Sequence, residues 1–174
     1  MVKVIFIDVD GPLAWATWDK GRVKISEGTW FECTIPYPWV QEDCAALAEI
    51  IERTEASLVV SSDWKLHYGL GQLKLIFEHY GINRHHVIDV TPSHNPRRKL
   101  SQYHAWDRAC QIQSWVKAFK PEQWISIDDL PLNISYRNLN IPQWRHVQVD
   151  GDHGMGGRLR DKVEECVTKL LKQK

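Results

Sequence analysis

The sequence has little of what marks secreted, membrane-spanning or strongly nucleic-acid-binding proteins. Its 174 residues contain no charged leader followed by a long apolar segment. No uncharged run reaches the roughly 18 residues that would span a bilayer. The 22 Lys and Arg residues balance the 22 Asp and Glu residues, so no net charge draws the whole chain to nucleic acid or to an anionic membrane. We therefore expect a soluble, cytoplasmic protein without a membrane partner.

Cysteine is also scarce, and its spacing excludes two further classes of protein. The four cysteines lie far apart, form no Cys-x-x-Cys pair and show no common zinc spacing with the histidines. We therefore expect free, buried thiols rather than a disulfide framework. Because no repeat, linker or low-complexity segment interrupts the chain, we predict a single domain over residues 1–174. The sequence does not indicate an oligomeric state.

Short apolar runs alternate with amphipathic segments along the chain. The runs, each typical of a strand covered on both faces, are residues 2–7, 58–60, 87–90, 124–127 and 146–149. The segments with apolar residues at helical spacing are 40–53, 70–80, 109–119 and 159–171. This alternation predicts a three-layer α/β fold around a mainly parallel sheet. In such folds ligands bind beyond the carboxyl ends of the strands.

Two regions depart from the alternation. Residues 14–38 are rich in tryptophan and turn-forming residues, and we interpret them as a small flap or cap inserted after the first strand. Within them, "WATWDKGRVKI" predicts a hairpin that closes at residues 19–21, and "TIPYP" holds too much proline for a helix. Residues 91–104 form a polar, basic loop without periodicity.

Two aspartates directly follow the first apolar run, in "VIFIDVDGPL". Asp8 and Asp10 are spaced so that an extended chain can place both on the same side. Adjacent carboxylates repel each other, so such a pair indicates a bound cation or a shared proton. Mg²⁺ is the natural candidate, because it prefers oxygen ligands and accompanies substrate phosphates. Two exposed turn aspartates are the alternative explanation of this motif on its own.

The same pattern recurs at other predicted strand ends. In "WISIDDLP" an apolar run stops at Asp128 and Asp129, and in a parallel sheet these carboxylates can converge with the first pair. A third run, "SLVVSSDW", ends at Ser61 and Ser62. Their hydroxyls can hydrogen-bond a phosphate oxygen or, alternatively, cap a helix.

These motifs resemble those of the haloacid dehalogenase (HAD) superfamily of phosphotransferases, from residue 4 to about residue 150. "DVDGPL" is similar to the first motif, "LVVSS" to the second and "ISIDDL" to the fourth. More narrowly, "SSDW", "DRACQIQSWVKAFKPEQWISIDD" and "HVQVDGDHGM" are similar to the HAD domains associated with Swiss Army Knife RNA-repair proteins. The resemblance implies an α/β/α Rossmann-like fold.

The resemblance also implies a phosphatase mechanism. Asp8 would be the nucleophile that forms an aspartyl-phosphate, and Asp10 the general acid and base. Asp128 would bind Mg²⁺ together with Asp8 and the main-chain carbonyl of Asp10, with Asp129 as a second ligand or support. Asp10 favours a phosphatase over a dehalogenase, because dehalogenating members lack this second aspartate.

Two further roles follow from the second and third motifs. Ser61 would hydrogen-bond the transferring phosphoryl group, with Ser62 as the alternative because the strand end is uncertain by one residue. The third motif supplies a Lys or Arg that stabilises negative charge. Arg108 fits the subgroup pattern, and Lys99 and Lys120 are the alternatives.

The resemblance further implies that a short insert at this place leaves the site open, so that bulky substrates can reach it. Trp15, Trp18, Trp30 and Trp64 can stack on a base or sugar, or else pack the hairpin. We therefore predict a Mg²⁺-dependent phosphomonoesterase acting on a nucleotide or a polynucleotide end. The alternatives are the same chemistry on a sugar phosphate or other small metabolite, and a binding module of this fold without turnover.

Overall fold

Strand β1 (Lys3–Ile7) lies at the centre of a five-stranded parallel sheet in the computed structural model, which describes residues 2–14, 21–29, 31–93, 104–150 and 157–171. The strand order is β5-β4-β1-β6-β7, and all four neighbouring pairs are parallel. The other strands are β4 (Ser57–Val60), β5 (Val87–Val90), β6 (Gln123–Asp128) and β7 (His146–Gln148). Each lies where the sequence predicted a strand.

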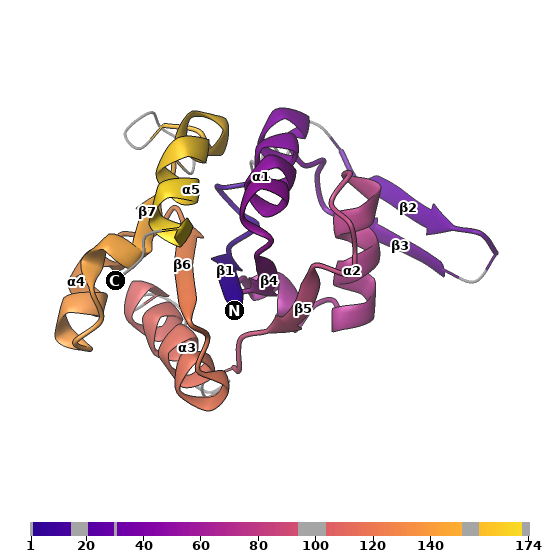
Figure 1. The fold of residues 1–174 in the computed structure, drawn as a ribbon. Coiled ribbons are helices and arrows are strands. Elements are labelled where there is room, and N and C mark those ends of the chain that lie inside the picture. Colours follow the sequence, from indigo (N-terminus) through magenta and orange to yellow (C-terminus); the bar gives the residue numbers. More distant parts are fainter. Residues whose placement is uncertain (1, 15–20, 30, 94–103, 151–156, 172–174) are drawn as a thin grey trace.

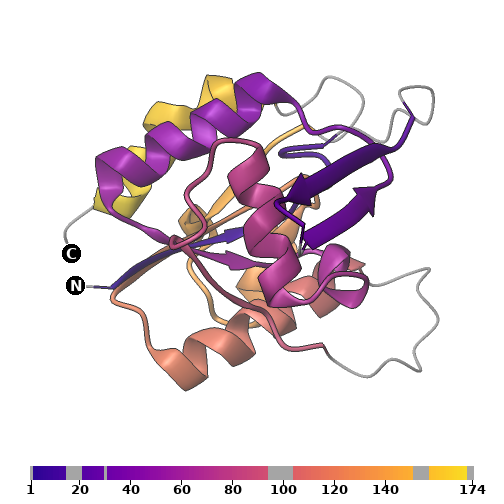
Figure 2. The same cartoon turned by 90° about the vertical axis from the view of Figure 1, so that its right-hand side faces the viewer.

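Helices cover both faces of this sheet (Figures 1 and 2). One face carries α1 (Gln41–Thr54), α2 (Leu70–His79) and α5 (Val163–Leu171), and α1 and α5 lie side by side. The opposite face carries α3 (His104–Phe119) and α4 (Leu132–Asn138). The arrangement confirms the predicted three-layer, Rossmann-like α/β fold.

The side-chain alternation of β1 explains why both faces are covered. Ile5 and Ile7 belong to the core beneath α1, α2 and α5, whereas Val4 and Phe6 belong to the core beneath α3 and α4. All four side chains are fully buried. A strand with no polar face can lie only between two apolar layers, so β1 occupies the centre.

Helix α1 shows how local sequence sets the helix ends. Glu42 and Asp43 lie in its first turn, where the helix dipole favours negative charge. The helix ends at Thr54 and is capped by Glu55, which adopts a left-handed conformation with φ +57° and donates its amide to the carbonyl of Ile51 over 2.7 Å. The observed helix lies within one residue of the prediction at each end.

A separate antiparallel pair follows β1 in the chain. Strands β2 (Val23–Glu27) and β3 (Phe31–Ile35) project beside α2 (Figure 1), and Ile25 pairs with Cys33 on the face that joins the core. Strand β2 ends at Glu27 and β3 begins at Phe31, so this hairpin is not the one predicted to close at residues 19–21, a turn that lies mostly outside the described residues and stays a prediction. Residues 15–20 lie outside the described chain, and the limits of the insert stay a prediction.

Shorter elements complete the fold. The three 3₁₀ helices of the described chain are η1 (Asp63–Leu66), η2 (Gln143–Arg145) and η3 (Leu159–Lys162). All four cysteines are free, and three of them are buried. Among the described helices, none has the length and apolar character needed to cross a membrane.

Candidate active site

Three aspartates gather at the carboxyl ends of β1 and β6. These strands pair with Ile7 opposite Ile127, and the amide of Asp8 donates to the carbonyl of Ile127 over 3.0 Å. This register places Asp8 beside Asp128, the last residue of β6. Carboxylate oxygens of Asp8, Asp128 and Asp129 lie within 4.8 Å of one another. Asp8 and Asp128 are almost completely buried, so water screens their repulsion poorly.

One guanidinium group bridges two of these carboxylates. Nη1 of Arg108, on α3, lies 2.8 Å from Oδ2 of Asp8 and 2.9 Å from Oδ2 of Asp128. Burial lowers the pKa of Arg108, but the two carboxylates outweigh it and raise that pKa overall. The group is therefore a permanent positive charge at the centre of the cluster.

The other two basic candidates are not seen at the cluster. Lys99 lies outside the described residues. Lys120 is exposed and follows the end of α3, where its amide donates to the carbonyl of Val116 over 2.8 Å. This helix end lies just before the start of β6, at the edge of the sheet opposite to Asp128. Of the two candidates that the structure describes, Arg108 is the one that contacts the acidic cluster.

The carboxylates remain in excess over the positive charge of Arg108. Burial raises the pKa of Asp128 far above its usual range, with Arg108 lowering it and Asp8 raising it further. Burial and the charge of Asp8 raise the pKa of Asp129 to about 6. Because burial and the neighbouring negative charge disfavour the ionised forms of Asp128 and Asp129, a bound divalent cation would favour those ionised forms. An all-oxygen, negatively charged donor set of this kind fits Mg²⁺.

Asp10 lies two residues further on, and its side chain has different partners. Its Oδ1 accepts hydrogen bonds from the hydroxyl of Tyr37 and from Nε1 of Trp64, the latter over 3.0 Å. Burial raises the pKa of Asp10 and outweighs the lowering by these hydrogen bonds. The side chain is not part of the three-carboxylate group, so a contribution of Asp10 to a metal would come from its main-chain carbonyl, as the resemblance implies.

The two serines after β4 differ in their hydrogen bonds. The amide of Ser61 donates to the carbonyl of Ile7 over 2.8 Å, which places Ser61 beside Asp8. The buried hydroxyl of Ser61 has no hydrogen-bond partner among the described residues. Ser62 instead caps η1, since its Oγ accepts from the amide of Trp64 over 3.4 Å. Ser61 therefore has the hydroxyl available to a ligand, and Ser62 fulfils the alternative capping role.

Of the four tryptophans considered for stacking, the structure describes Trp64. Trp15, Trp18 and Trp30 lie outside the described residues. Trp64 is only 4% exposed and packs edge-on against Trp39, with ring centroids 5.5 Å apart. Trp64 therefore packs within the protein, which favours the packing alternative over stacking on a substrate base.

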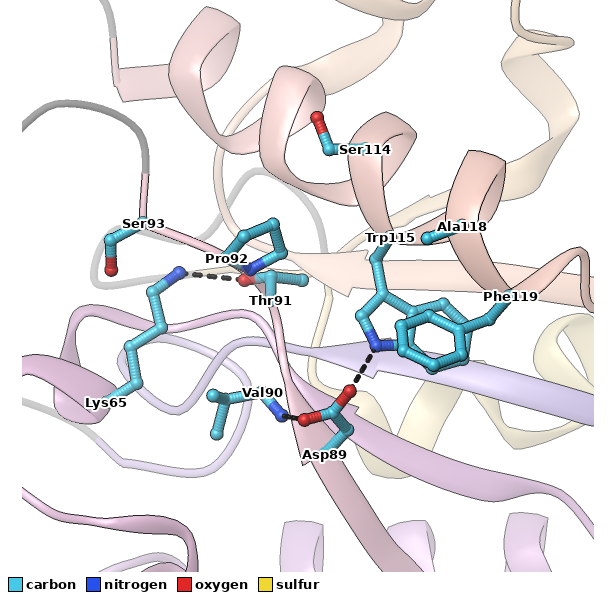
Figure 3. A pocket seen from close by; sticks show the side chains of 10 residues that line it. All are labelled: Lys65, Asp89, Val90, Thr91, Pro92, Ser93, Ser114, Trp115, Ala118 and Phe119. Atoms are coloured by element: carbon cyan, nitrogen blue, oxygen red, sulfur yellow. Dashed lines mark hydrogen bonds between the residues drawn. The ribbon is translucent and has the colours of Figure 1, made fainter.

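Sequence reasoning missed Lys65, which lies on η1 in a pocket of about 390 Å³ between β5 and α3 (Figure 3). Its ammonium donates to Oγ1 of Thr91 over 2.7 Å and to the side chain of Gln111. Burial and the charge of Arg108 lower the pKa of Lys65 to about 8. The signal available was its position shortly after Ser61, which places a cation next to the second motif.

Tyr37 was missed as well. It follows β3 by two residues, and its contact with Asp10 joins segments that are distant in the chain. No local pattern in the sequence signals such a contact.

A polar groove of about 710 Å³ has Asp129 in its lining. The groove extends over β7 and the neighbouring 3₁₀ segment, and its lining includes Trp144, Gln148, Lys162 and Lys169. The amide side chain of Gln148 donates to the carbonyl of Asp129 over 3.1 Å, which ties this surface to the acidic cluster. The groove is therefore a polar surface adjacent to the three carboxylates.

Comparison with known proteins gives one match. The model of the family described as "HAD domain in Swiss Army Knife RNA repair proteins" matches residues 4–157. No curated protein and no solved structure matches the chain. The matched range includes every residue of the acidic cluster, together with Asp10, Ser61 and Arg108.

Proposed function

Because the chain belongs to the family of HAD domains in Swiss Army Knife RNA repair proteins, we propose that it is a Mg²⁺-dependent phosphomonoesterase that acts through an aspartyl-phosphate. The proposed substrate is a nucleotide or a polynucleotide end that carries a phosphate. The observation that carries the proposal is the group of Asp8, Asp128 and Asp129, in which the buried Asp8 and Asp128 are bridged by Arg108.

In the first step, a carboxylate oxygen of Asp8 forms a bond to phosphorus as the bond from phosphorus to the leaving oxygen breaks. Arg108, within 3 Å of Oδ2 of Asp8, stabilises the negative charge on the nucleophile and the phosphoryl group. The hydroxyl of Ser61 donates to a phosphoryl oxygen. Asp10 gives its proton to the leaving oxygen.

In the second step, water releases the phosphate. Asp10, now ionised, takes a proton from a water molecule as the water oxygen attacks phosphorus, and Asp8 leaves as a carboxylate. Mg²⁺ would be held by Asp8, Asp128 and the main-chain carbonyl of Asp10, with Asp129 as ligand or support. The ion would supply the positive charge that lets an anionic nucleophile approach an anionic phosphate.

Two observations support a nucleic-acid end as the substrate. The matching family is described by its occurrence in RNA repair proteins. The polar groove next to Asp129 also offers room for the part of a substrate beyond its phosphate. A sugar phosphate or other small metabolite is the second candidate substrate, and the substrate panel below includes sugar phosphates.

The test begins with hydrolysis of an aryl phosphate with Mg²⁺ or with EDTA, by the wild type and by Asp8→Asn. We expect Mg²⁺-dependent turnover that Asp8→Asn abolishes without changing the melting temperature much. Asp161→Asn, which changes an exposed aspartate at the start of η3, is the matched control and should keep full activity. Absence of turnover in a folded wild-type sample would favour a non-catalytic module, and activity in Asp8→Asn would remove Asp8 from the nucleophile role.

A substrate panel then separates the two substrate classes. It compares mononucleotides, oligonucleotides phosphorylated at the 3′ or the 5′ end, and sugar phosphates by kcat/KM. A preference for oligonucleotides that weakens with added salt is expected, because phosphate contacts release counterions. A higher kcat/KM for sugar phosphates would support the small-metabolite alternative instead.

A further inference from the structure

Two aromatic side chains outside the phosphate-binding motifs hold the carboxylate of Asp10. The hydroxyl of Tyr37, just after β3, and Nε1 of Trp64, on η1, both donate to the same oxygen, Oδ1. Both rings are buried, and their centroids lie 6.1 Å apart in an edge-on contact. Trp64 packs in turn against Trp39 and Tyr68. The donors are therefore part of a rigid aromatic cluster rather than mobile surface groups.

The two carboxylate oxygens of Asp10 differ in their hydrogen bonds. Two donors converging on Oδ1 restrict the rotation of the carboxylate. Within the described part of the chain, Oδ2 accepts no hydrogen bond. A general acid must bring its proton within hydrogen-bond reach of the leaving oxygen, so the orientation of the carboxylate limits the rate of proton transfer. The structure thus leaves Oδ2 as the oxygen that can carry and transfer the proton.

We propose that Tyr37 is a positioning residue, which together with Trp64 anchors Oδ1 of Asp10 and so directs Oδ2 to the leaving group. The proton moves from Oδ2 to the leaving oxygen as the bond to phosphorus breaks, and Tyr37 keeps its own proton throughout. Since Tyr37 follows β3, the contact connects the β2–β3 pair to proton transfer. The inference rests on the proposed function, because it takes Asp10 as the general acid.

Leaving-group dependence tests this role directly. An alkyl phosphate, such as a nucleoside 3′-phosphate, has a poor leaving group that needs protonation, whereas nitrophenyl phosphate needs little. The quantity to compare is kcat/KM, because it reports the steps up to release of the leaving group. In Tyr37→Phe we expect the ratio of alkyl to nitrophenyl kcat/KM to fall by about 10- to 100-fold. Asp10→Asn, measured in parallel, sets the largest change that loss of the acid can cause.

Tyr68→Phe is the matched control. The hydroxyl of Tyr68 donates to the carbonyl of Thr34 in β3 over 3.0 Å, and its ring packs against Trp64. The variant therefore removes a tyrosine hydroxyl that joins the same hairpin and aromatic cluster, without touching Asp10. The substrate ratio should stay at the wild-type value.

The outcomes are distinguishable from those that test the function itself. If Tyr37→Phe keeps the wild-type ratio of alkyl to nitrophenyl kcat/KM, whether or not both values fall, the positioning role is wrong while the phosphatase assignment stands. If the folded wild type hydrolyses neither ester with Mg²⁺, the proposed function fails and the inference fails with it. Trp64→Phe removes the other donor, and it should shift the ratio in the same direction; it serves as the test if Tyr37→Phe does not fold.

Discussion

Replacing Arg108 by methionine should strongly destabilise the metal-free protein. Methionine preserves the unbranched aliphatic part of the side chain and removes the charge that lies within 3 Å of both Asp8 and Asp128. Removing one partner of a buried ion pair costs about 3–5 kcal/mol, because the remaining charge stays buried without compensation. Two carboxylates lose their partner here, which argues for the upper part of this range.

Protonation limits that loss. Burial already raises the pKa of Asp128, so without Arg108 this carboxylate can bind a proton instead of remaining charged. We therefore expect a decrease of about 3 kcal/mol in the free energy of unfolding near neutral pH. This is a large part of the 5–15 kcal/mol typical of a natural domain, yet it leaves a folded state to measure.

Urea unfolding in EDTA and in excess Mg²⁺ provides the assay. Mg²⁺ at about 100 times its dissociation constant contributes roughly 2.7 kcal/mol, so the ion should recover most of the stability lost in Arg108→Met. It should also stabilise this variant more than the wild type, in which Arg108 repels the cation. Arg53→Met, which breaks exposed contacts to Glu49 and Glu164, is the control and should respond weakly to both treatments. Equal stability of the two variants in EDTA would refute the reasoning.

Two further predictions concern the glycine beside the acidic cluster and the buried histidine of β7. Gly11 has φ +89°, and a Cβ there would lie 2.7 Å from Cβ of Asp129. Gly11→Ala should therefore lower the free energy of unfolding in urea by about 1–3 kcal/mol and raise the Mg²⁺ concentration needed for half-maximal activity. Unchanged Mg²⁺ dependence would contradict this. Burial lowers the pKa of His146 to about 4. Between about pH 6.5 and pH 4 the unfolded chain therefore binds more protons than the folded protein does. The free energy of unfolding should fall by up to about 3 kcal/mol as the pH drops through this range. The melting temperature of His146→Leu should lack this part of the pH dependence. Identical pH profiles of melting temperature for the wild type and His146→Leu would disprove the role of His146.

The fold was largely predictable because its strands and longer helices have distinct periodicities. The continuous apolar runs of β1 and β6 indicate strands covered on both faces, and α1 shows its apolar stripe clearly. The seven residues of α4 give too few turns for a periodic pattern, so this helix was not predicted. The pairing of β2 with β3 was not predicted, because glycine occurs near both candidate turns and only the packing of Ile25 against the core identifies the buried face of this pair.

The acidic cluster was predictable for a different reason. Asp8 and Asp128 follow apolar runs, and the carboxyl ends of neighbouring parallel strands lie at one edge of the sheet. Ser61 and Ser62 could not be separated from the sequence, because a shift of one residue along a strand exchanges the faces. The contact of Tyr37 with Asp10 depends on how the hairpin docks, which no local pattern encodes.

The pairing of β1 with β6 also bears on the order of folding events. Ile7 and Ile127 are far apart in the sequence, and their pairing closes a long loop. Asp8 and Asp128 therefore begin to repel each other only once this late, long-range contact forms. A cation that neutralises them acts on the completed sheet and slows its opening, while the early, local steps of folding proceed at the same rate with or without it.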